Sequence, residues 1–450
     1  MSPGSDEPGP QGKGTEGNRT VDHFRYVNGV LHCEAMPVPD IAHRFGTPAF
    51  VYSARTFTER YDELAAAFAE LDPIICYSVK SCQNLHICRL LHERGASFDV
   101  VSGGELSRVL EVGADPSRVV FAGAGKTDAE IRQGIEAGIG WFNVESQQEL
   151  ENLTRSAQDL GRPVRAALRV NPDVDPETHA YTTTGKQETK FGVDLDRARD
   201  VFARSGRNNW VTLSALHLHI GSPVDTVRPY VEAIRKTLEV IRQLRADGFE
   251  ITALDIGGGF GVDYETGQAP SLADYARAIV PLLRGAGLTV IVEPGRTISA
   301  NAAILLGRVL YTKQSGARQY AIVDAAMTEL IRPALYGASH FVWPVAVGED
   351  HVPSARKCDL KLPGTVQIDV VGPVCETGDF LARGRWLPPV TRGDLLAIFS
   401  AGAYAFVMSS QYNSRPRAPE VLVEGDRARL IRRRETYDDL VEAERTATHQ

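Results

Sequence analysis

The sequence has few cysteines and no long apolar segment. Six cysteines are spread over 450 residues, and none of them forms a Cys-x-x-Cys pair. A disulfide framework or a cysteine-based zinc site needs denser or more regular spacing, so reduced thiols are expected instead. No apolar run approaches the roughly 18–20 residues that a membrane-spanning helix requires. The first residues also lack the basic and apolar segments of a secretory signal, and we therefore expect a soluble cytoplasmic protein.

An excess of positive charge is absent as well. The 49 Lys and Arg residues are outnumbered by 57 Asp and Glu residues, which gives a net charge of -8. Nucleic acids and anionic membranes are bound by basic faces, so neither is expected as a partner. Residues 1–22 contain almost no apolar side chains. Such a segment buries too little surface to offset the entropy of ordering, and we predict a disordered tail there.

What the sequence does contain is a regular alternation of short apolar runs and amphipathic segments. The apolar runs, each of strand length, lie at 74–79, 97–101, 118–122, 140–144, 165–170, 214–220, 251–256 and 289–293. Segments with apolar residues at helical spacing separate them, among them 85–93, 104–111, 128–137, 147–158 and 226–244. This pattern predicts an α/β protein with a parallel (β/α)8 TIM-like barrel. A doubly wound open sheet is the alternative that periodicity alone does not exclude.

A second domain is expected after the barrel. Beyond residue 305 the strand-like runs are separated by turn residues rather than by long helices, which predicts a mainly β domain. The expected organisation is the tail, a barrel at 45–305, a β domain built from 23–44 and 306–432, and a C-terminal helix and tail at 433–450. The polar stretch 173–191 is long enough to be a mobile loop at an active site.

Lys80 ends the first apolar run of the barrel, Ile74 to Val79. Desolvation disfavours the charged form of a lysine, so an amine in a cavity at this position is expected to have a lowered pKa. An amine of that kind is nucleophilic at neutral pH and suits a Schiff base with an aldehyde cofactor. The alternative is a lysine at a strand–loop junction that simply reaches solvent.

Polar side chains stand at the end of most of the other predicted strands. The active site of a β/α barrel lies at the carboxyl ends of its strands. These ends carry Lys80, Asp99, Asn143, Arg169, His219, the glycines 257–259 and Glu293. Asp99 or Arg169 alone is more commonly an ion-pair residue than a catalyst. Together, however, the set predicts a polar cavity at one end of the barrel.

Two further features point to a bound phosphate. The segment Asp255 to Gly261 reads DIGGGFG after a strand, and a glycine run allows backbone N–H groups to approach an anion closely. Ser222 adds a small hydroxyl next to His219. His217 and His219 share one strand face, with His219 nearer the mouth and His217 one layer deeper. A zinc site built on both histidines lacks a third ligand at a recognisable spacing, and no metal is predicted.

These elements together fit pyridoxal 5'-phosphate. Lys80 supplies the amine, the glycine run the anion site, His219 a flat imidazole and Glu293 a carboxylate. A carboxylate paired with the ring nitrogen keeps it protonated, which makes the ring a strong electron sink.

Several motifs also resemble a known family, the alanine-racemase-fold (fold-type III) pyridoxal-phosphate decarboxylases of basic amino acids, and within it the diaminopimelate decarboxylases. The motifs are YSVKS (77–81), HIGS (219–222), GGGFG (257–261), EPGR (293–296), IRPALY (331–336), GPVCETGD (372–379), GAYAF (402–406) and YNSRPR (412–417). Their order and spacing, from about residue 25 to 430, make the resemblance specific. It implies a barrel plus a β domain, and active sites shared across a homodimer.

The resemblance also implies roles for individual residues. Lys80 corresponds to the Schiff-base lysine, His219 to the imidazole on the cofactor ring, and Cys375 to a proton-donating thiol inserted by the neighbouring subunit. The remaining cofactor-binding positions are Asp99, Arg169, Ser222, Gly257, Gly258, Gly259, Glu293, Gly295, Arg296 and Tyr404. The substrate-binding positions are Arg296, Arg332, Tyr336, Glu376 and Tyr404.

The implied reaction is decarboxylation of meso-2,6-diaminopimelate to L-lysine, the last step of lysine biosynthesis. Arg332 and Tyr336 suit a distal carboxylate, and Glu376 suits the distal ammonium. Ornithine and lysine lack that carboxylate, so an arginine would repel their terminal ammonium. A same-fold decarboxylase of ornithine, lysine, carboxynorspermidine or carrier-bound glutamate remains the main alternative. An amino-acid racemase of the same fold is disfavoured. The family resemblance implies that such racemases have an arginine at the ring nitrogen, whereas this chain has Glu293 at that position.

The non-enzyme alternative is an inactive regulatory homologue, which the presence of Lys80, Glu293 and Cys375 disfavours. The chain departs from the usual family pattern in a few places, namely Ser78, Ser81-Cys82, Ala326 (in Asp324 to Met327, where the family usually has Asp-Ala-Gly-Met) and Gln411. None of these is a position with an implied catalytic role.

Overall fold

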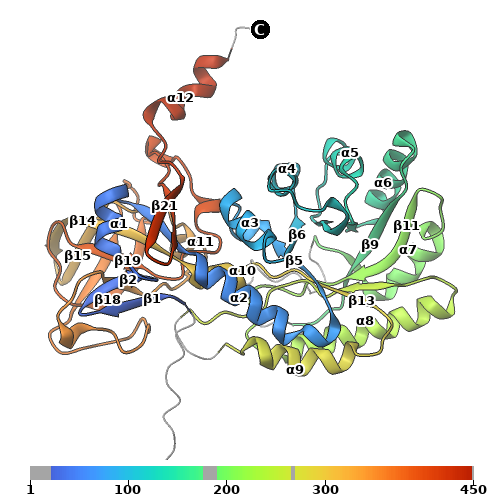
Figure 1. Ribbon diagram of the computed structural model, residues 1–450, viewed down its shortest axis with the longest axis horizontal. Helices are drawn as coiled ribbons and strands as arrows, with labels where there is room; N and C mark the ends of the chain where they lie inside the picture. Colours follow the sequence, from blue (N-terminus) through green and yellow to red (C-terminus); the bar gives the residue numbers. More distant parts are fainter. Residues whose placement is uncertain (1–21, 176–189, 265–268, 448–450) are drawn as a thin grey trace, which may run out of the picture.

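The computed structural model describes residues 22–175, 190–264 and 269–447. Figure 1 shows two bodies side by side, an α/β body and a smaller body made mainly of strands. Almost all of the tail predicted at 1–22, and most of the loop predicted at 173–191, lie outside the described residues. Both therefore stay predictions.

Eight parallel strands of the described residues close into a barrel. In spatial order they are β5 (Ile74–Ser78), β6 (Ser97–Val100), β7 (Val120–Phe121), β8 (Trp141–Val144), β9 (Val164–Asn171), β11 (Val211–His217), β12 (Ala253–Asp255) and β13 (Thr289–Val292). β13 pairs with β5, and β8 pairs with β9, so the ring is complete. An open sheet has two free edges, so this closure confirms the barrel and excludes the doubly wound alternative. A short strand, β10 (Val193–Asp194), extends β9 outside the ring.

Helices surround this barrel on the outside (Figure 1). They are α2 (Ala54–Ala67), α3 (Leu85–His92), α4 (Gly103–Glu111), α5 (Asp128–Ala137), α6 (Gln147–Leu160), α7 (Ala198–Ser205), α8 (Arg228–Ala246) and α9 (Leu272–Leu283). Side-chain caps fix where several of them begin. Thr127 accepts from the backbone N–H of Glu130 while Glu130 caps Thr127 in return, and Ser271 and Asp274 form the same box on α9.

The barrel interior is filled with side chains rather than hollow. Seven of its strands contribute one buried residue each to a compact cluster, which consists of Cys76, Val120, Trp141, Ala167, Ala215, Ala253 and Ile291. This apolar plug forms the floor on which polar residues at the strand ends lie, because side chains of a small barrel pack in layers.

The second body is a mainly β domain. Its strands are β4 (Ala49–Ser53), β14 (Ala303–Ser315), β15 (Arg318–Val323), β16 (Val342–Pro344), β17 (Val366–Val371), β18 (Phe380–Leu387), β19 (Leu395–Ile398), β20 (Glu420–Glu424) and β21 (Arg427–Arg432). The long strand β14 is central, since it pairs antiparallel with β4, β15 and β19. The predicted combination of a barrel and a β domain is therefore confirmed.

One boundary differs from the prediction. Residues 45–305 were assigned to the barrel, but β4 pairs with β14 and β20 in the second sheet. All five residues of β4 are buried. A strand buried on both faces has the same apolar pattern in either domain, so pattern alone did not separate the two.

The two ends of the described chain also belong to the β side. Strands β1 (Phe24–Val27), β2 (Val30–Cys33) and β3 (Met36–Pro37) form a small sheet, joined to the β domain by a hydrogen bond from the Leu31 N–H to the Val345 carbonyl. They are followed by α1 (Val38–Phe45). The C-terminal helix α12 (Tyr437–Thr446) has no buried residue and projects away from the body (Figure 1).

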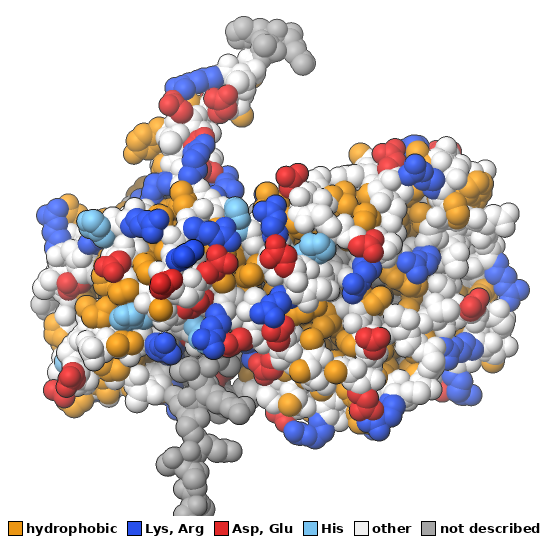
Figure 2. Space-filling model, viewed as in Figure 1, with side chains coloured by type: hydrophobic (Ala, Val, Ile, Leu, Met, Phe, Trp, Pro, Cys, Tyr) orange, Lys and Arg blue, Asp and Glu red, His pale blue; other side chains and the backbone are white. Residues whose placement is uncertain are grey.

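Acidic and basic side chains are interspersed over the face shown in Figure 2. No helix within the described residues combines the length and apolar character needed to cross a bilayer.

The core of the β domain can be tested at Leu305, which is fully buried in β14. Leu305→Ala should lower the free energy of unfolding by about 2–5 kcal/mol, because it removes buried methyl groups and leaves a cavity. Urea denaturation followed by circular dichroism measures this loss. The matched control is Leu430→Ala on β21, where the side chain is 45% exposed; there a change of under about 0.5 kcal/mol is expected. Equal losses in the two variants would contradict the assigned core.

Candidate active site

Lys80 lies at the mouth of the barrel, in the turn Val79–Ser81 that follows β5. Its Nζ donates a hydrogen bond to Oδ2 of Asp99 at 2.8 Å. The Ser78 hydroxyl donates to the same oxygen at 2.6 Å. Asp99 is completely buried, and its Oδ1 has no hydrogen-bond partner within the described part of the chain. The sequence therefore placed the amine at the correct end of the barrel.

The expected direction of the Lys80 pKa is wrong in this structure. Burial alone would lower it, but the negative charges of Asp99 and Glu293, together with Tyr404, raise the pKa of Lys80 above its ordinary value. Desolvation is the largest single effect, but the direct contact with Asp99 and the charges of Glu293 and Tyr404 together outweigh it. Without cofactor, Lys80 is an ammonium held in place by carboxylates, not a free amine.

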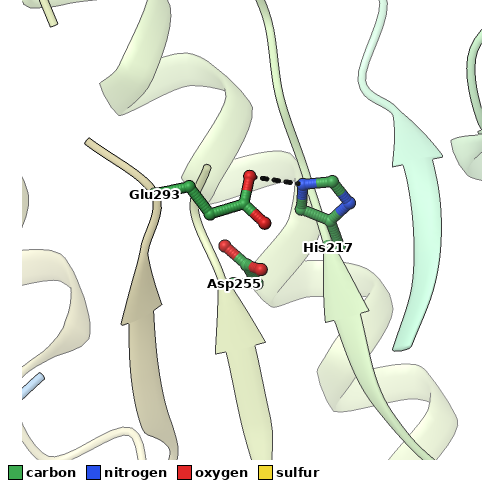
Figure 3. Close-up of side chains that lie close together, drawn as sticks. All are labelled: His217, Asp255 and Glu293. Atoms are coloured by element: carbon green, nitrogen blue, oxygen red, sulfur yellow. Dashed lines mark ion pairs between the residues drawn. The ribbon is translucent and has the colours of Figure 1, made fainter. Parts of the chain in front are cut away.

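A buried group of four polar side chains lies beside Lys80, on the apolar floor. It consists of Asn143, His217, Asp255 and Glu293, which are at most 4% exposed. Nδ2 of Asn143 donates to Asp255 at 3.1 Å and to Glu293 at 3.2 Å. Nε2 of His217 lies 3.4 Å from Oε2 of Glu293, within ion-pair distance but outside hydrogen-bond geometry. Figure 3 shows the two carboxyl groups facing each other, with the imidazole beside them.

The pKa values of the two carboxyl groups in this cluster are shifted in opposite directions. Burial and the charge of Glu293 raise the pKa of Asp255 well above its usual range. Burial would also raise the pKa of Glu293, but His217, Lys80 and Asp255 hold it below its usual range. At neutral pH the pair therefore holds one proton, which lies on Asp255, while Glu293 is ionised.

His219 and Arg169 stand at the ends of neighbouring strands. Burial and the charges of Arg169 and Lys80 lower the pKa of His219 well below its ordinary value, so its ring is neutral. Nη1 of Arg169 donates to Oε1 of Glu145 at 2.7 Å, and both side chains are buried. Glu145 also accepts from the backbone N–H of Gly192. The guanidinium is thus fixed in position before any ligand binds.

The glycine run fits between two neighbouring strand ends. A Cβ on Gly258 would lie 1.9 Å from the Glu293 carbonyl oxygen, so only glycine fits there. The N–H of Gly257 donates to Asp255 and that of Gly258 to His219. Two of the three predicted anion donors are therefore used within the protein. Of the three glycines, only Gly259 is left within the described residues to donate its backbone N–H to an anion, and this contact stays a prediction.

A second polar cluster lies around Arg296, the first residue of α10 (Arg296–Ser299). Its Nε donates to the Ser222 hydroxyl at 3.0 Å and its Nη1 to the Tyr264 hydroxyl at 2.8 Å. The guanidinium also stacks over the ring of Tyr404, 4.9 Å from its centroid. The Tyr404 N–H donates to the Ser81 carbonyl, so a loop of the β domain closes this side of the barrel mouth.

Arg332 extends that cluster into the β domain. It begins α11 (Arg332–Tyr336), is 7% exposed, and stacks over the ring of Tyr264 at 5.1 Å from the centroid. Its Nη1 lies 3.1 Å from Nε2 of His340. Burial and the charge of Arg332 lower the pKa of His340 to about 3, so this imidazole is a neutral acceptor. Tyr336 is one turn later on the same helix and hence on the same face.

Cys375 and Glu376 are not part of these clusters. Both are exposed, on the loop between β17 and β18, and Sγ of Cys375 lies 3.5 Å from Oδ1 of Asn413. The carboxylate of Asp379 accepts from the N–H groups of Val374 and Met327, which fixes the loop. The fold therefore presents the thiol to the outside.

Comparisons with known proteins agree with this arrangement. Residues 54–300 match the family model "Pyridoxal-dependent decarboxylase, pyridoxal binding domain". The chain is 46% identical to diaminopimelate decarboxylase of Pseudomonas aeruginosa over 94% of its own length and 99% of that protein. The protein belongs to the diaminopimelate decarboxylase family.

Two further members of this family extend the similarity. The chain is 44% identical to the enzyme of Aquifex aeolicus over 93% of its own length and 97% of the relative. The crystal structure of the Helicobacter pylori enzyme complexed with L-lysine superposes with a TM-score of 0.85 at 37% identity, covering 91% of this chain and 99% of the other. The family resemblance inferred from the motifs is therefore confirmed, as is dependence on pyridoxal phosphate.

The residues at the mouth fit the cofactor of this family. The Lys80 ammonium and the neutral imidazole of His219 lie at the mouth, and the Glu293 carboxylate lies on the floor. A buried guanidinium, Arg296, and the Ser222 hydroxyl that accepts from it provide an anion site at the same mouth. The unsatisfied buried Oδ1 atoms of Asp99 and Asn143 add acceptors that a polar ligand can engage.

Sequence reasoning missed several residues of the site. Glu145 directly follows a barrel strand, so the strand-end rule that selected Asn143 could have found it. Asp255 was noted only as part of the glycine motif, although it ends β12. Tyr264 and His340 lie in loops, and nothing in the local sequence pattern distinguishes them.

Glu145 provides a test of how this site is held. Glu145→Gln should lower the free energy of unfolding by about 3–5 kcal/mol, because it leaves the buried Arg169 charge without its ionic partner. Chemical denaturation measures the change. The matched control is Asp159→Asn, whose partner Arg132 is exposed; there the expected loss is at most about 1 kcal/mol. A loss in Glu145→Gln as small as in the control would show that Arg169 does not depend on Glu145.

Proposed function

We propose that the protein removes CO2 from meso-2,6-diaminopimelate to form L-lysine, with pyridoxal 5'-phosphate as its cofactor, as the last step of lysine biosynthesis. The observation that carries the proposal is Lys80 at the barrel mouth, hydrogen-bonded to Asp99 and within the field of the buried Glu293 carboxylate, in a site that also has the buried guanidinium groups of Arg296 and Arg332. Cytoplasmic placement is part of the proposal and is supported by six free cysteines.

The side chains at the barrel mouth have separate proposed roles toward the cofactor. Lys80 would hold the cofactor's aldehyde carbon, and Glu293 would keep a proton on the ring nitrogen. The neutral ring of His219 would pack against the cofactor ring. Pyridoxal phosphate, when bound, supplies the electron sink for the pair left at the substrate's α-carbon as CO2 departs. Burial of Glu293 and Asp99 keeps water from the floor of the site, which strengthens the charge interactions there.

The phosphate side lies around Arg296. Its guanidinium and the Ser222 hydroxyl already contact each other at 3.0 Å, so both point to one place. Tyr404 lies under the same guanidinium and Gly295 precedes it on the chain. Together with Gly259 they would bind the phosphate, since a planar guanidinium recognises phosphate oxygens well.

Substrate choice is proposed to depend on Arg332. Within the described residues, no carboxylate lies in ion-pair distance of it, although the side chain is 7% exposed. A buried guanidinium held by a neutral imidazole and an aromatic ring is prepared for an external anion. The distal carboxylate of diaminopimelate supplies that anion, with Tyr336 as its second contact. Ornithine and lysine would bring an ammonium to the same place.

A substrate panel tests this assignment. With added pyridoxal phosphate, the protein should release CO2 from meso-2,6-diaminopimelate and at most traces from L-lysine and L-ornithine. Arg332→Gln should lower kcat/KM for diaminopimelate by about 30-fold or more, because a buried charge pair costs at least about 2 kcal/mol to break. Arg132→Gln, on the exposed pair with Asp159, is the control. Faster turnover of ornithine than of diaminopimelate would reject the proposed substrate.

The active site is proposed to be completed by a second copy of the chain. Cys375 is the proposed proton donor, yet it is exposed on a rigid loop of the β domain rather than buried like a structural thiol. A homodimer that places this loop over the other copy's barrel mouth would bring Cys375 to the α-carbon and Glu376 to the distal ammonium. In that arrangement the exposed side chains of Cys375 and Glu376 would both lie in the active site of the other copy.

Mixing two inactive variants tests the shared site. Lys80→Ala and Cys375→Ala should each lose most activity. A 1:1 mixture, dissociated and reassociated, should recover about a quarter of wild-type activity, because half of the dimers are mixed and each mixed dimer has one intact site. Steady-state CO2 release measures the recovery, and each variant reassociated alone is the control. Absence of recovery in a mixture shown by mass spectrometry to contain mixed dimers would place Lys80 and Cys375 in the same chain's site.

A further inference from the structure

Asp255 has no role in the reaction described so far, yet it is the most enclosed charged group of the site floor. It ends β12, is 0% exposed, and lies beside Glu293, which is 4% exposed. One carboxyl oxygen of each residue and one ring nitrogen of His217 lie within 4.8 Å of one another. In Figure 3 the Asp255 carboxyl is directed at Glu293 from below.

We propose that Asp255 is a positioning residue that keeps its proton and donates it in a hydrogen bond to Glu293, so that Glu293 stays a carboxylate aimed at the cofactor ring. The proposal rests on the proposed function, because it assumes that Glu293 serves the ring nitrogen.

The contacts determine which carboxyl holds the proton. Two adjacent carboxylates out of reach of water do not both ionise, since like charges in a low-dielectric site repel strongly. Glu293 has the cationic side of the site, with Lys80 and His217 lowering its pKa. Asp255 instead meets the Gly257 N–H at 2.9 Å and the Asn143 amide at 3.1 Å, both neutral donors. The proton is therefore held on Asp255.

The arrangement also explains why Asp255 lies next to Glu293 on the floor of the site. Nδ2 of Asn143 donates to both carboxyl groups and so joins them from the side. Backbone pairing sets Asp255 level with His217 across neighbouring strands, and Ile291 of β13 pairs with Asp255 two residues before Glu293. A proton donor at that depth orients the glutamate along the barrel axis toward the mouth. It also keeps a second negative charge from opposing the ionisation of Glu293.

A metal ion is the competing interpretation of the same geometry. His217, Asp255 and Glu293 together offer one nitrogen and two carboxylates. A metal would require both acids to be ionised and would occupy the lone pairs that Glu293 needs for the ring. The proton and the metal therefore predict opposite protonation states for Asp255.

Infrared difference spectroscopy tests the proton directly. For the full-length protein without cofactor at pH 7.5, the wild-type minus Asp255→Asn difference spectrum should contain the carbonyl band of a buried protonated carboxylic acid, since the bands of other buried acids with raised pKa, such as Glu105 and Glu329, cancel. The band should shift in deuterated buffer. The matched control is Asp159→Asn, an exposed aspartate whose removal should leave the band in place. A difference spectrum without this band would overturn the proposal, as would a divalent metal that copurifies with the wild type and is lost in Asp255→Ala.

Cofactor binding tests the positioning role. Asparagine has the shape of a protonated aspartic acid and can donate to Glu293, so Asp255→Asn should bind pyridoxal phosphate within about threefold of wild type, whereas Asp255→Ala should bind it about tenfold more weakly or worse. Equilibrium titration by visible absorbance gives both values, with circular dichroism to confirm folding. Equal affinity in the alanine variant, or loss in the asparagine variant as large as in Glu293→Gln, would overturn the role.

Failure of the proposed function is recognised separately. Borohydride reduction of the holoenzyme followed by peptide mapping should label Lys80. A label elsewhere would reject the cofactor assignment, while the infrared band of Asp255 would still report on the shared proton.

Discussion

The site depends on the way buried charges at the barrel mouth neutralise one another. Asp99 and Glu293 place two buried carboxyl groups at the mouth, and the Lys80 ammonium donates to Asp99 while the charge of Glu293 also acts on it. Any one of these charges alone would be very costly to bury. The Lys80 ammonium favours the ionised form of both carboxyl groups, and they favour its charged form, although burial and the charge of Glu293 still hold the pKa of Asp99 above its ordinary value. The positions of the three side chains therefore follow from electrostatics as much as from backbone geometry.

The apolar plug beneath them makes this possible. Side chains from seven strands fill the barrel below the polar layer, so the charges meet a dry floor on one side and the mouth on the other. Backbone register then sets the lateral order, because Arg169, His217 and Asp255 are paired across adjacent strands. A one-residue slip in any of these strands would turn its polar side chain to the helical layer.

The β domain contributes more than a surface. Tyr404 closes the side of the mouth around Arg296 through the hydrogen bond from its backbone N–H to Ser81, and Arg332 reaches the same region from α11. Tyr264 joins the two arginines, with a hydrogen bond to Arg296 and a stacked contact with Arg332. The proposed reaction chemistry thus lies on the barrel, whereas the proposed contacts with the substrate's far end lie at the junction of the two domains.

Much of this could be predicted from the amino-acid sequence by itself. The alternation of apolar runs determined the barrel, because strand and helix periods are local properties of the chain, and strand ends located Lys80, Asp99, Arg169 and Glu293. Only the tertiary structure decided that β4 belongs to the second sheet, that Glu145 anchors Arg169, and that carboxylates raise rather than lower the Lys80 pKa. Those outcomes depend on which distant side chains come into contact, and contact between residues far apart in the chain leaves no periodic trace in the sequence.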